Sequence, residues 1–165
     1  MKTIPLTQGM WATVDDEDYN LLAAHRWHAL KDVCKNRVVW YAVRNGPRGH
    51  SKRQLLRMHR EILSITNPKT PVDHANGNGL DNRRENLRKA TSPQNNQNRH
   101  KAPGHSSRFK GVAWHKSADK WQAYIQIDRR LKSLGRFSDE ETAAKAYDAA
   151  AREAFGEFAL TNFGA

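Results

Sequence analysis

Apolar residues in the first half of the chain follow two different periods. Alternating apolar and aromatic residues at 10–14 and 38–43 end in turn-forming residues and predict strands of a small sheet. Between them, the acidic run 15–18 precedes the segment 19–27, whose apolar spacing fits a short helix with carboxylates in its first turn. Residues 52–63 mix strand and helix periods, so periodicity leaves their structure open.

The segment 72–98 predicts a strand, a loop, a second strand and a helix. A short strand is expected at 72–74, followed by a loop rich in Asn and Gly, residue types that tolerate positive φ. A return strand is expected at 87–91. The helix after it has Ser92 as its N-cap and a proline in its first position, which puts Asn95 in the first turn, facing the strand pair.

The second half of the chain predicts a three-stranded sheet covered by one helix. Strand patterns occur at 109–115, 120–127 and 131–137, and the middle one alternates apolar and polar residues cleanly. The sequence leaves open which side chains of the third strand face the core, because strict alternation puts the charged Lys132 and the apolar Leu134 on the same face. The helix carries a stripe of small residues that can lie against the apolar face of the sheet. The expected fold class is therefore α+β.

Composition narrows the classes of function. The 165 residues hold 28 Lys and Arg against 17 Asp and Glu, giving a net charge of +11 that favours an anionic partner, nucleic acid first. The single Cys34 excludes an intrachain disulfide and a cysteine zinc cluster, so a bound metal would need oxygen or imidazole ligands. No apolar run approaches the roughly 20 residues that span a bilayer, and the start of the chain lacks a secretory pattern, so a cytoplasmic protein is expected.

Three short patterns in the middle of the chain carry the candidate chemistry. They are Val-Asp-His-x-Asn-Gly-Asn at 72–78, Asp-Asn-Arg-x-Glu-Asn-Leu-Arg at 81–88 and Asn-x-x-Asn-Arg at 95–99. In this order they resemble the HNH (histidine-asparagine-histidine) endonucleases, in particular the homing branch in which asparagine replaces the last histidine. The resemblance covers about residues 57–100 and implies a small strand-strand-helix (ββα) metal nuclease core.

Hydrolysis of a phosphodiester needs an activated water and neutralisation of charge on the phosphate and the leaving oxygen. His74 is the expected general base, since imidazole titrates near neutral pH. Asp73 and Asn95 offer two oxygen ligands for one divalent ion, magnesium or manganese rather than zinc. By the resemblance, Asn86 would accept a hydrogen bond from His74 and hold its ring. The residues expected to contact phosphates are Arg83, Arg84 and Arg88.

Some of these assignments have competitors in the sequence. Asn82 is an alternative to Asn86 as the orienting residue, and Asn96 or Asn98 is an alternative to Asn95. His59 resembles a histidine that precedes the motif in the family, with either a structural or a phosphate-contacting role. The remaining histidines have no metal-ligand spacing and are expected to be surface or packing residues; they are His25, His28, His50, His100, His105 and His115.

The second half resembles the apetala-two domain of plant ethylene-response factors. The shared patterns are Phe-Lys-Gly-Val at 109–112, Lys-Trp-x-Ala-x-Ile at 120–125, Leu-Gly-x-Phe at 134–137, Glu-x-Ala-x-x-Ala-Tyr-Asp-x-Ala-Ala at 141–151 and Asn-Phe at 162–163. That family reads DNA with its sheet. The positions implied here are Lys110, His115, Gln122, Tyr124, Gln126 and Arg130 or Lys132. The family's usual side chains are absent at Ala113, Tyr124 and Ser133, so the plant target sequence does not carry over.

The sequence therefore predicts a site-directed DNA endonuclease of the homing type. Its expected parts are a β-rich DNA-binding or support segment at 1–56, the nuclease motif at 57–100, a linker at 101–107 and a DNA-binding domain at 108–165. We expect a monomer that acts on double-stranded DNA with one divalent ion, in the cytoplasm of a prokaryotic or phage-infected cell. A single site per chain favours nicking. The alternatives are an inactive DNA-binding regulator on a nuclease-like scaffold and an RNA-binding protein.

Overall fold

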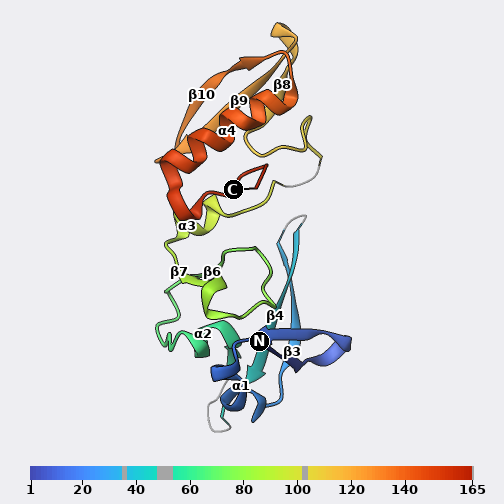
Figure 1. Cartoon of the computed structure of the whole chain (residues 1–165), viewed down its shortest axis with the longest axis vertical. Coiled ribbons are helices and arrows are strands. Elements are labelled where there is room, and N and C mark those ends of the chain that lie inside the picture. The colour runs from blue at the N-terminus through green and yellow to red at the C-terminus, as the bar shows by residue number, and fades with distance from the viewer. Residues whose placement is uncertain (35–36, 48–53, 102–103, 165) are drawn as a thin grey trace. The chain divides into compact units, whose positions relative to one another are not determined.

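The computed structural model describes residues 1–34, 37–47, 54–101 and 104–164. The chain divides into two compact units, Met1–Asn95 and Asn96–Ala165. Both units combine helices with small antiparallel sheets, which confirms the α+β class (Figure 1). None of the described helices is long and apolar enough to cross a membrane.

The first unit begins with a hairpin of β1 (Lys2–Pro5) and β2 (Trp11–Val14), and α1 (Asp16–Ala23) follows it. A second sheet has the order β3-β4-β5, and α2 follows directly on its last strand. The bounds are β3 (His28–Cys34), β4 (Arg37–Asn45), β5 (Leu55–Arg57) and α2 (Met58–Ile62). The segment with mixed periods is thus a strand that turns into a helix. The predicted strands at 10–14 and 38–43 are confirmed. A helix with the acidic residues in its first turn is also confirmed, but it ends at Ala23 and not at Trp27.

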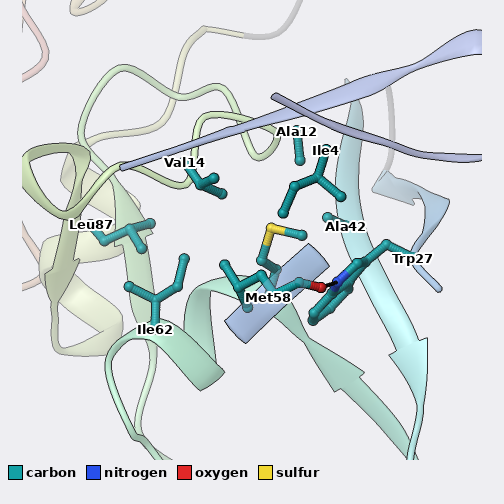
Figure 2. Close-up of a cluster of buried hydrophobic side chains, with 9 residues drawn as sticks. Ile4, Ala12, Val14, Trp27, Ala42, Met58, Ile62 and Leu87 are labelled. Carbon is teal, nitrogen blue, oxygen red and sulfur yellow. Dashed lines mark hydrogen bonds between the residues drawn. The ribbon is translucent and has the colours of Figure 1, made fainter. Parts of the chain in front are cut away.

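One hydrophobic core joins these elements to the predicted nuclease segment (Figure 2). Ile4, Val14 and Trp27 of the N-terminal part pack in the same cluster as Met58 of α2 and Leu87 of the predicted return strand. The indole of Trp27 donates a hydrogen bond of 2.8 Å to the Leu22 carbonyl, so its one polar group is satisfied in this core. The segments 1–56 and 57–95 therefore bury their apolar surface together.

The strand pair is β6 (Val72–His74) and β7 (Leu87–Lys89), and α3 (Ser92–Gln97) comes after it, as the sequence predicted. The predicted N-cap is wrong by one residue. The Thr91 hydroxyl accepts from the Gln94 amide at 3.4 Å, and the Gln94 side-chain oxygen accepts from the Thr91 amide at 2.7 Å. This reciprocal pair is a capping box, so Ser92 is the first helical residue. Asn95 remains in the first turn and is half-buried.

The loop between β6 and β7 is bound to the N-terminal hairpin. The Thr13 amide donates to the Leu80 carbonyl at 2.9 Å, and the Asn82 amide donates to the Thr13 carbonyl at 2.7 Å. The buried carboxylate of Asp18 accepts two hydrogen bonds from the Arg84 guanidinium, at 2.7 and 2.8 Å. The acidic run therefore both opens α1 and holds the segment that leads into β7.

The second unit is an antiparallel sheet of order β10-β9-β8, with α4 (Glu140–Phe155) lying across one face (Figure 1). The strands are β8 (Val112–His115), β9 (Lys120–Ile127) and β10 (Arg130–Phe137). Ala123 and Ile125 of the middle strand are buried against α4, which confirms the predicted alternation. The N-cap of α4 is Asp139, whose carboxylate accepts from the Thr142 amide at 2.7 Å.

Two buried groups fix the end of the second unit to its start. Gly111 has φ +73°, and a Cβ there would lie 1.9 Å from the Tyr147 ring, so only glycine fits. The carboxylate of Asp148, 2% exposed, accepts from the amides of Asn162 at 2.8 Å and Phe163 at 2.9 Å. Asn162 in turn bonds both backbone groups of Lys110. The Asn-Phe pair near the C-terminus is therefore structural.

Candidate active site

The Asp73–His74 pair lies on β6 and both side chains are buried, at 5% and 6% exposed. Asp73 is directly opposite Arg88 in the register of β6 and β7. The Nε and Nη2 groups of Arg88 donate to Oδ2 of this carboxylate, at 2.9 and 2.7 Å. A cross-strand ion pair of this kind keeps a buried carboxylate charged. The Asp73 carboxylate is thus held by Arg88 beside a buried imidazole.

His74 belongs to a cluster of three rings that come from three elements. The His59 ring, on α2, stands perpendicular to the His74 ring with the centroids 5.0 Å apart. The Tyr41 ring, on β4, is 5.9 Å from His74 and 5.7 Å from His59. Because rings packed in this way leave little freedom to rotate, the cluster fixes the orientation of the His74 imidazole.

Burial lowers the pKa of His74, against opposing contributions from the Asn82 side chain and the Asp73 charge. Burial also lowers the pKa of His59 to about 3, with further contributions from His74 and Arg57. Both imidazoles are therefore neutral near pH 7. A neutral imidazole is the form that can take a proton from water. At 4% exposed, His59 fits the structural role better than the phosphate-contacting one.

Asn82 and Asn86, the two candidates for orienting His74, occupy different places. The Asn86 side chain accepts from the Asn76 amide at 2.9 Å and donates to the Asp81 carbonyl at 2.7 Å, so it closes the loop between β6 and β7. Asn82 is fully buried and near enough to His74 to oppose the fall in its pKa. Its amide oxygen and nitrogen make no hydrogen bond of ordinary geometry to the described residues. Asn82 is the amide placed next to the imidazole.

Asp73 and Asn95 were predicted to offer two oxygen donors for a cation. The described residues (1–34, 37–47, 54–101 and 104–164) contain no group of three or more His, Cys, Asp or Glu side chains that could hold a metal ion. A cation at Asp73 and Asn95 would therefore take most of its coordination from water and substrate. Magnesium and manganese bind in this way, through one or two oxygen side chains. The donor set fits these ions, whereas catalytic zinc uses three protein ligands.

The three arginines predicted to contact phosphates all pair with carboxylates of this chain. Arg83 bonds Asp81 at 2.7 and 2.8 Å and also pairs with Glu85. Arg84 pairs with Asp18, as described above, and with Glu17 at 2.8 Å. Arg88 holds Asp73. The Arg83 guanidinium keeps the pKa of Asp81 below its usual value. These arginines hold the motif together, and a phosphate would have to displace their carboxylates.

Sequence reasoning missed two residues beside the site, Tyr41 and Arg57, because both precede the motif or lie at its edge. The Arg57 guanidinium lies 4.9 Å over the centre of the Tyr41 ring. One signal was present in the sequence, the glycine at position 79. A Cβ on Gly79 would lie 2.4 Å from the Trp40 carbonyl and 2.7 Å from the Tyr41 ring. A glycine in the motif loop therefore marks where the loop meets β4.

The second unit leaves one face of its sheet without a helix. By register, the residues on this face are Ala113, His115, Lys120, Gln122, Tyr124, Gln126, Leu131, Ser133 and Arg136. His115, Gln122, Tyr124 and Gln126 were predicted there. Arg136 was not, and its guanidinium lies 3.2 Å from the His115 ring. Leu131 is 68% exposed.

Three other predicted DNA contacts lie elsewhere. Arg130 and Lys132 are opposite Ile127 and Ile125, hence on the face that bears α4. Leu134 shares this face with Lys132 and packs on the core, and a bulge between Ser133 and Gly135 returns Phe137 to the same face. Lys110 precedes β8, and its ammonium donates to the Gln97 carbonyl. Burial lowers the pKa of Lys110 to about 8.

A buried Asp-His pair on one strand, a second antiparallel strand and a following helix with an asparagine in its first turn define a site of the strand-strand-helix nuclease class. No family model matches the chain. It is 34% identical over 132 residues to an uncharacterised HNH endonuclease of Acanthamoeba polyphaga mimivirus, a match over 77% of this chain and 68% of that protein. It is also 27% identical over 107 residues to protein 3.8 of Escherichia phage T7, over 62% of this chain and 88% of that protein. The chain belongs to the HNH endonuclease family.

Proposed function

We propose that the protein is a metal-dependent DNA endonuclease of the homing type, with His74 as the general base. The observation that carries this proposal is the neutral, ring-packed imidazole of His74, which follows Asp73, paired with Arg88, on one strand. Family membership supplies the nuclease class. The net charge of +11 favours a polyanionic substrate. Magnesium or manganese at Asp73 and Asn95 completes the site.

His74 takes a proton from the water that attacks phosphorus. The new bond joins the water oxygen to phosphorus, and the bond from phosphorus to the departing deoxyribose oxygen breaks. The rings of His59 and Tyr41 hold the imidazole in place for this transfer, and Asn82 lies beside it. Asn86 keeps the loop closed behind it. A divalent ion, when bound, neutralises charge on the phosphate and on the departing oxygen.

The second unit is proposed to select the DNA sequence with its uncovered sheet face. Its amide and phenol side chains, Gln122, Tyr124 and Gln126, are of the types that read base edges in the major groove. His115 and Arg136 at the same face add positive or hydrogen-bonding groups for the backbone. A single site per chain suits a monomer that nicks one strand of a duplex. Both relatives are viral proteins, so we place the reaction in an infected cell.

Supercoiled plasmid incubated with the protein and magnesium tests the function. Open circles are expected from the unaltered protein, and none with EDTA or from His74→Ala. His105→Ala, a change at an exposed histidine of the second unit, is the matched control and should nick normally. A plasmid left intact by protein that still binds duplex DNA would favour an inactive regulator instead. Nicking by His74→Ala at the normal rate would remove His74 as the base.

A further inference from the structure

Most arginines described in the first unit have their charge engaged inside the protein. Arg83, Arg84 and Arg88 bond carboxylates as described above. Arg44 bonds Glu61 through two nitrogens, at 2.8 and 3.0 Å. Arg60 donates to two backbone carbonyls, one of them Thr70 at 2.7 Å. Each of these guanidinium groups would have to give up bonds before it took a phosphate.

Arg57 differs from all of them. The carboxylate paired with it, on Asp32, is 3.8 Å away, beyond hydrogen-bond reach. The two side chains are 39% and 48% exposed, so water and salt screen this attraction. The contact that fixes the guanidinium is the face of the Tyr41 ring at 4.9 Å, which leaves its N–H groups at the edge able to bond an anion.

The position of Arg57 is set by three elements that also hold the candidate base. It ends β5, opposite Val43 of β4, and it lies two residues before His59. The Tyr41 ring beneath it also packs against His74. Through the Tyr41 ring, the Arg57 guanidinium therefore borders the same ring cluster that holds His74.

We propose that Arg57 binds the phosphate group at which the DNA strand is cut. The inference rests on the nuclease function proposed above. A guanidinium offers two parallel N–H groups to the non-bridging oxygens of a phosphodiester. Negative charge on those oxygens increases as water attacks phosphorus, so a fixed cation stabilises the transition state more than the bound substrate. The N-terminal segment, by this inference, supplies part of the active site and does not only support it.

Three variants separate this role from a general loss of charge. Arg57→Met removes the cation, Arg57→Lys keeps the charge without the planar fork, and Arg26→Met removes one exposed cation elsewhere in the same unit. Circular dichroism checks that each is folded. The first readout is the single-turnover nicking rate on supercoiled plasmid with magnesium. The second is binding to a linear duplex in EDTA over a range of salt concentrations.

For Arg57→Met we expect a nicking rate lower by about 100-fold or more, the effect of removing one preorganised donor to a developing anion. The slope of log binding constant against log salt should become shallower by about 0.9, the loss of one phosphate contact. Arg57→Lys should restore the slope and only part of the rate. Arg26→Met should nick normally.

A salt slope unchanged in Arg57→Met overturns the proposal, as does a nicking rate within about threefold of normal. These outcomes differ from failure of the nuclease function itself. In that case the unaltered protein would leave plasmid intact with magnesium, while the salt slope of Arg57→Met would still report whether Arg57 contacts a phosphate.

Discussion

Burial of His59 should make the first unit lose stability as the pH falls. The pKa of this imidazole is 6.5 in an unfolded chain and about 3 in the folded unit, because the ring is 4% exposed and next to His74. Between these two values the unfolded chain binds a proton that the folded unit does not. Stability linked to His59 is therefore fully present above pH 6.5 and is lost as the pH falls toward 3.

The size of the effect follows from the shift in pKa. At about pH 5 the unfolded histidine is mostly protonated and the buried one is neutral, which costs about 2 kcal/mol relative to about pH 7. The full shift sets a ceiling of about 5 kcal/mol at very low pH. A loss of this size is a large fraction of the stability of a small domain.

Urea unfolding of the unaltered protein and of His59→Gln, at about pH 7 and about pH 5, measures the contribution of His59 to the free energy of unfolding. Amide NMR signals from β4 report on the first unit alone. The variant cannot titrate at this position, so its free energy of unfolding should fall by about 2 kcal/mol less than that of the unaltered protein between the two pH values. His25→Gln, at an exposed histidine, is the control and should match the unaltered protein. A difference below about 0.5 kcal/mol would refute the reasoning.

Two further changes test the packing of the site and the role of the second unit. Gly79→Ala should destabilise the first unit by about 1–3 kcal/mol in urea unfolding and slow nicking, because its Cβ would push into the Tyr41 ring. The control is Gly164→Ala, which adds a methyl group in open space. Equal stability of the two variants would contradict the close approach of Gly79 to Tyr41. Gln122→Ala should weaken binding to a selected DNA site by about 1–3 kcal/mol with little change on random duplex. Selection from a random duplex pool measures the sequence preference of each variant. The control is Glu153→Ala, on the exposed side of α4. If Gln122→Ala selects the same sequence as the unaltered protein, the sheet does not read the DNA sequence.

Local patterns were sufficient for most elements of this fold. Alternation at 120–127 predicted a half-buried strand because side chains of a strand point to opposite faces in turn, and Ala123 and Ile125 are buried as expected. Capping was predicted less accurately. Neighbouring Thr91 and Ser92 are both good caps, and only the bonds to Gln94 distinguish them. The structure of residues 55–62 was left open because a strand passes into a helix there without a break.

The order of the Asp-His pair, the two strands and the asparagine-bearing helix could be predicted from the sequence, since these are contiguous and depend on local propensity and on patterns within about thirty residues. The surroundings of His74 could not, because they come from distant parts of the chain. Tyr41 and Arg57 reach it from a sheet whose strands lie far from the motif in sequence, and Asn82 stands beside it where Asn86 was expected. The number of charged residues in the sequence likewise does not show which arginines are paired with carboxylates and which can bind a ligand. Those facts depend on which faces pack together in the shared core, and burial of apolar surface acts without regard to sequence separation.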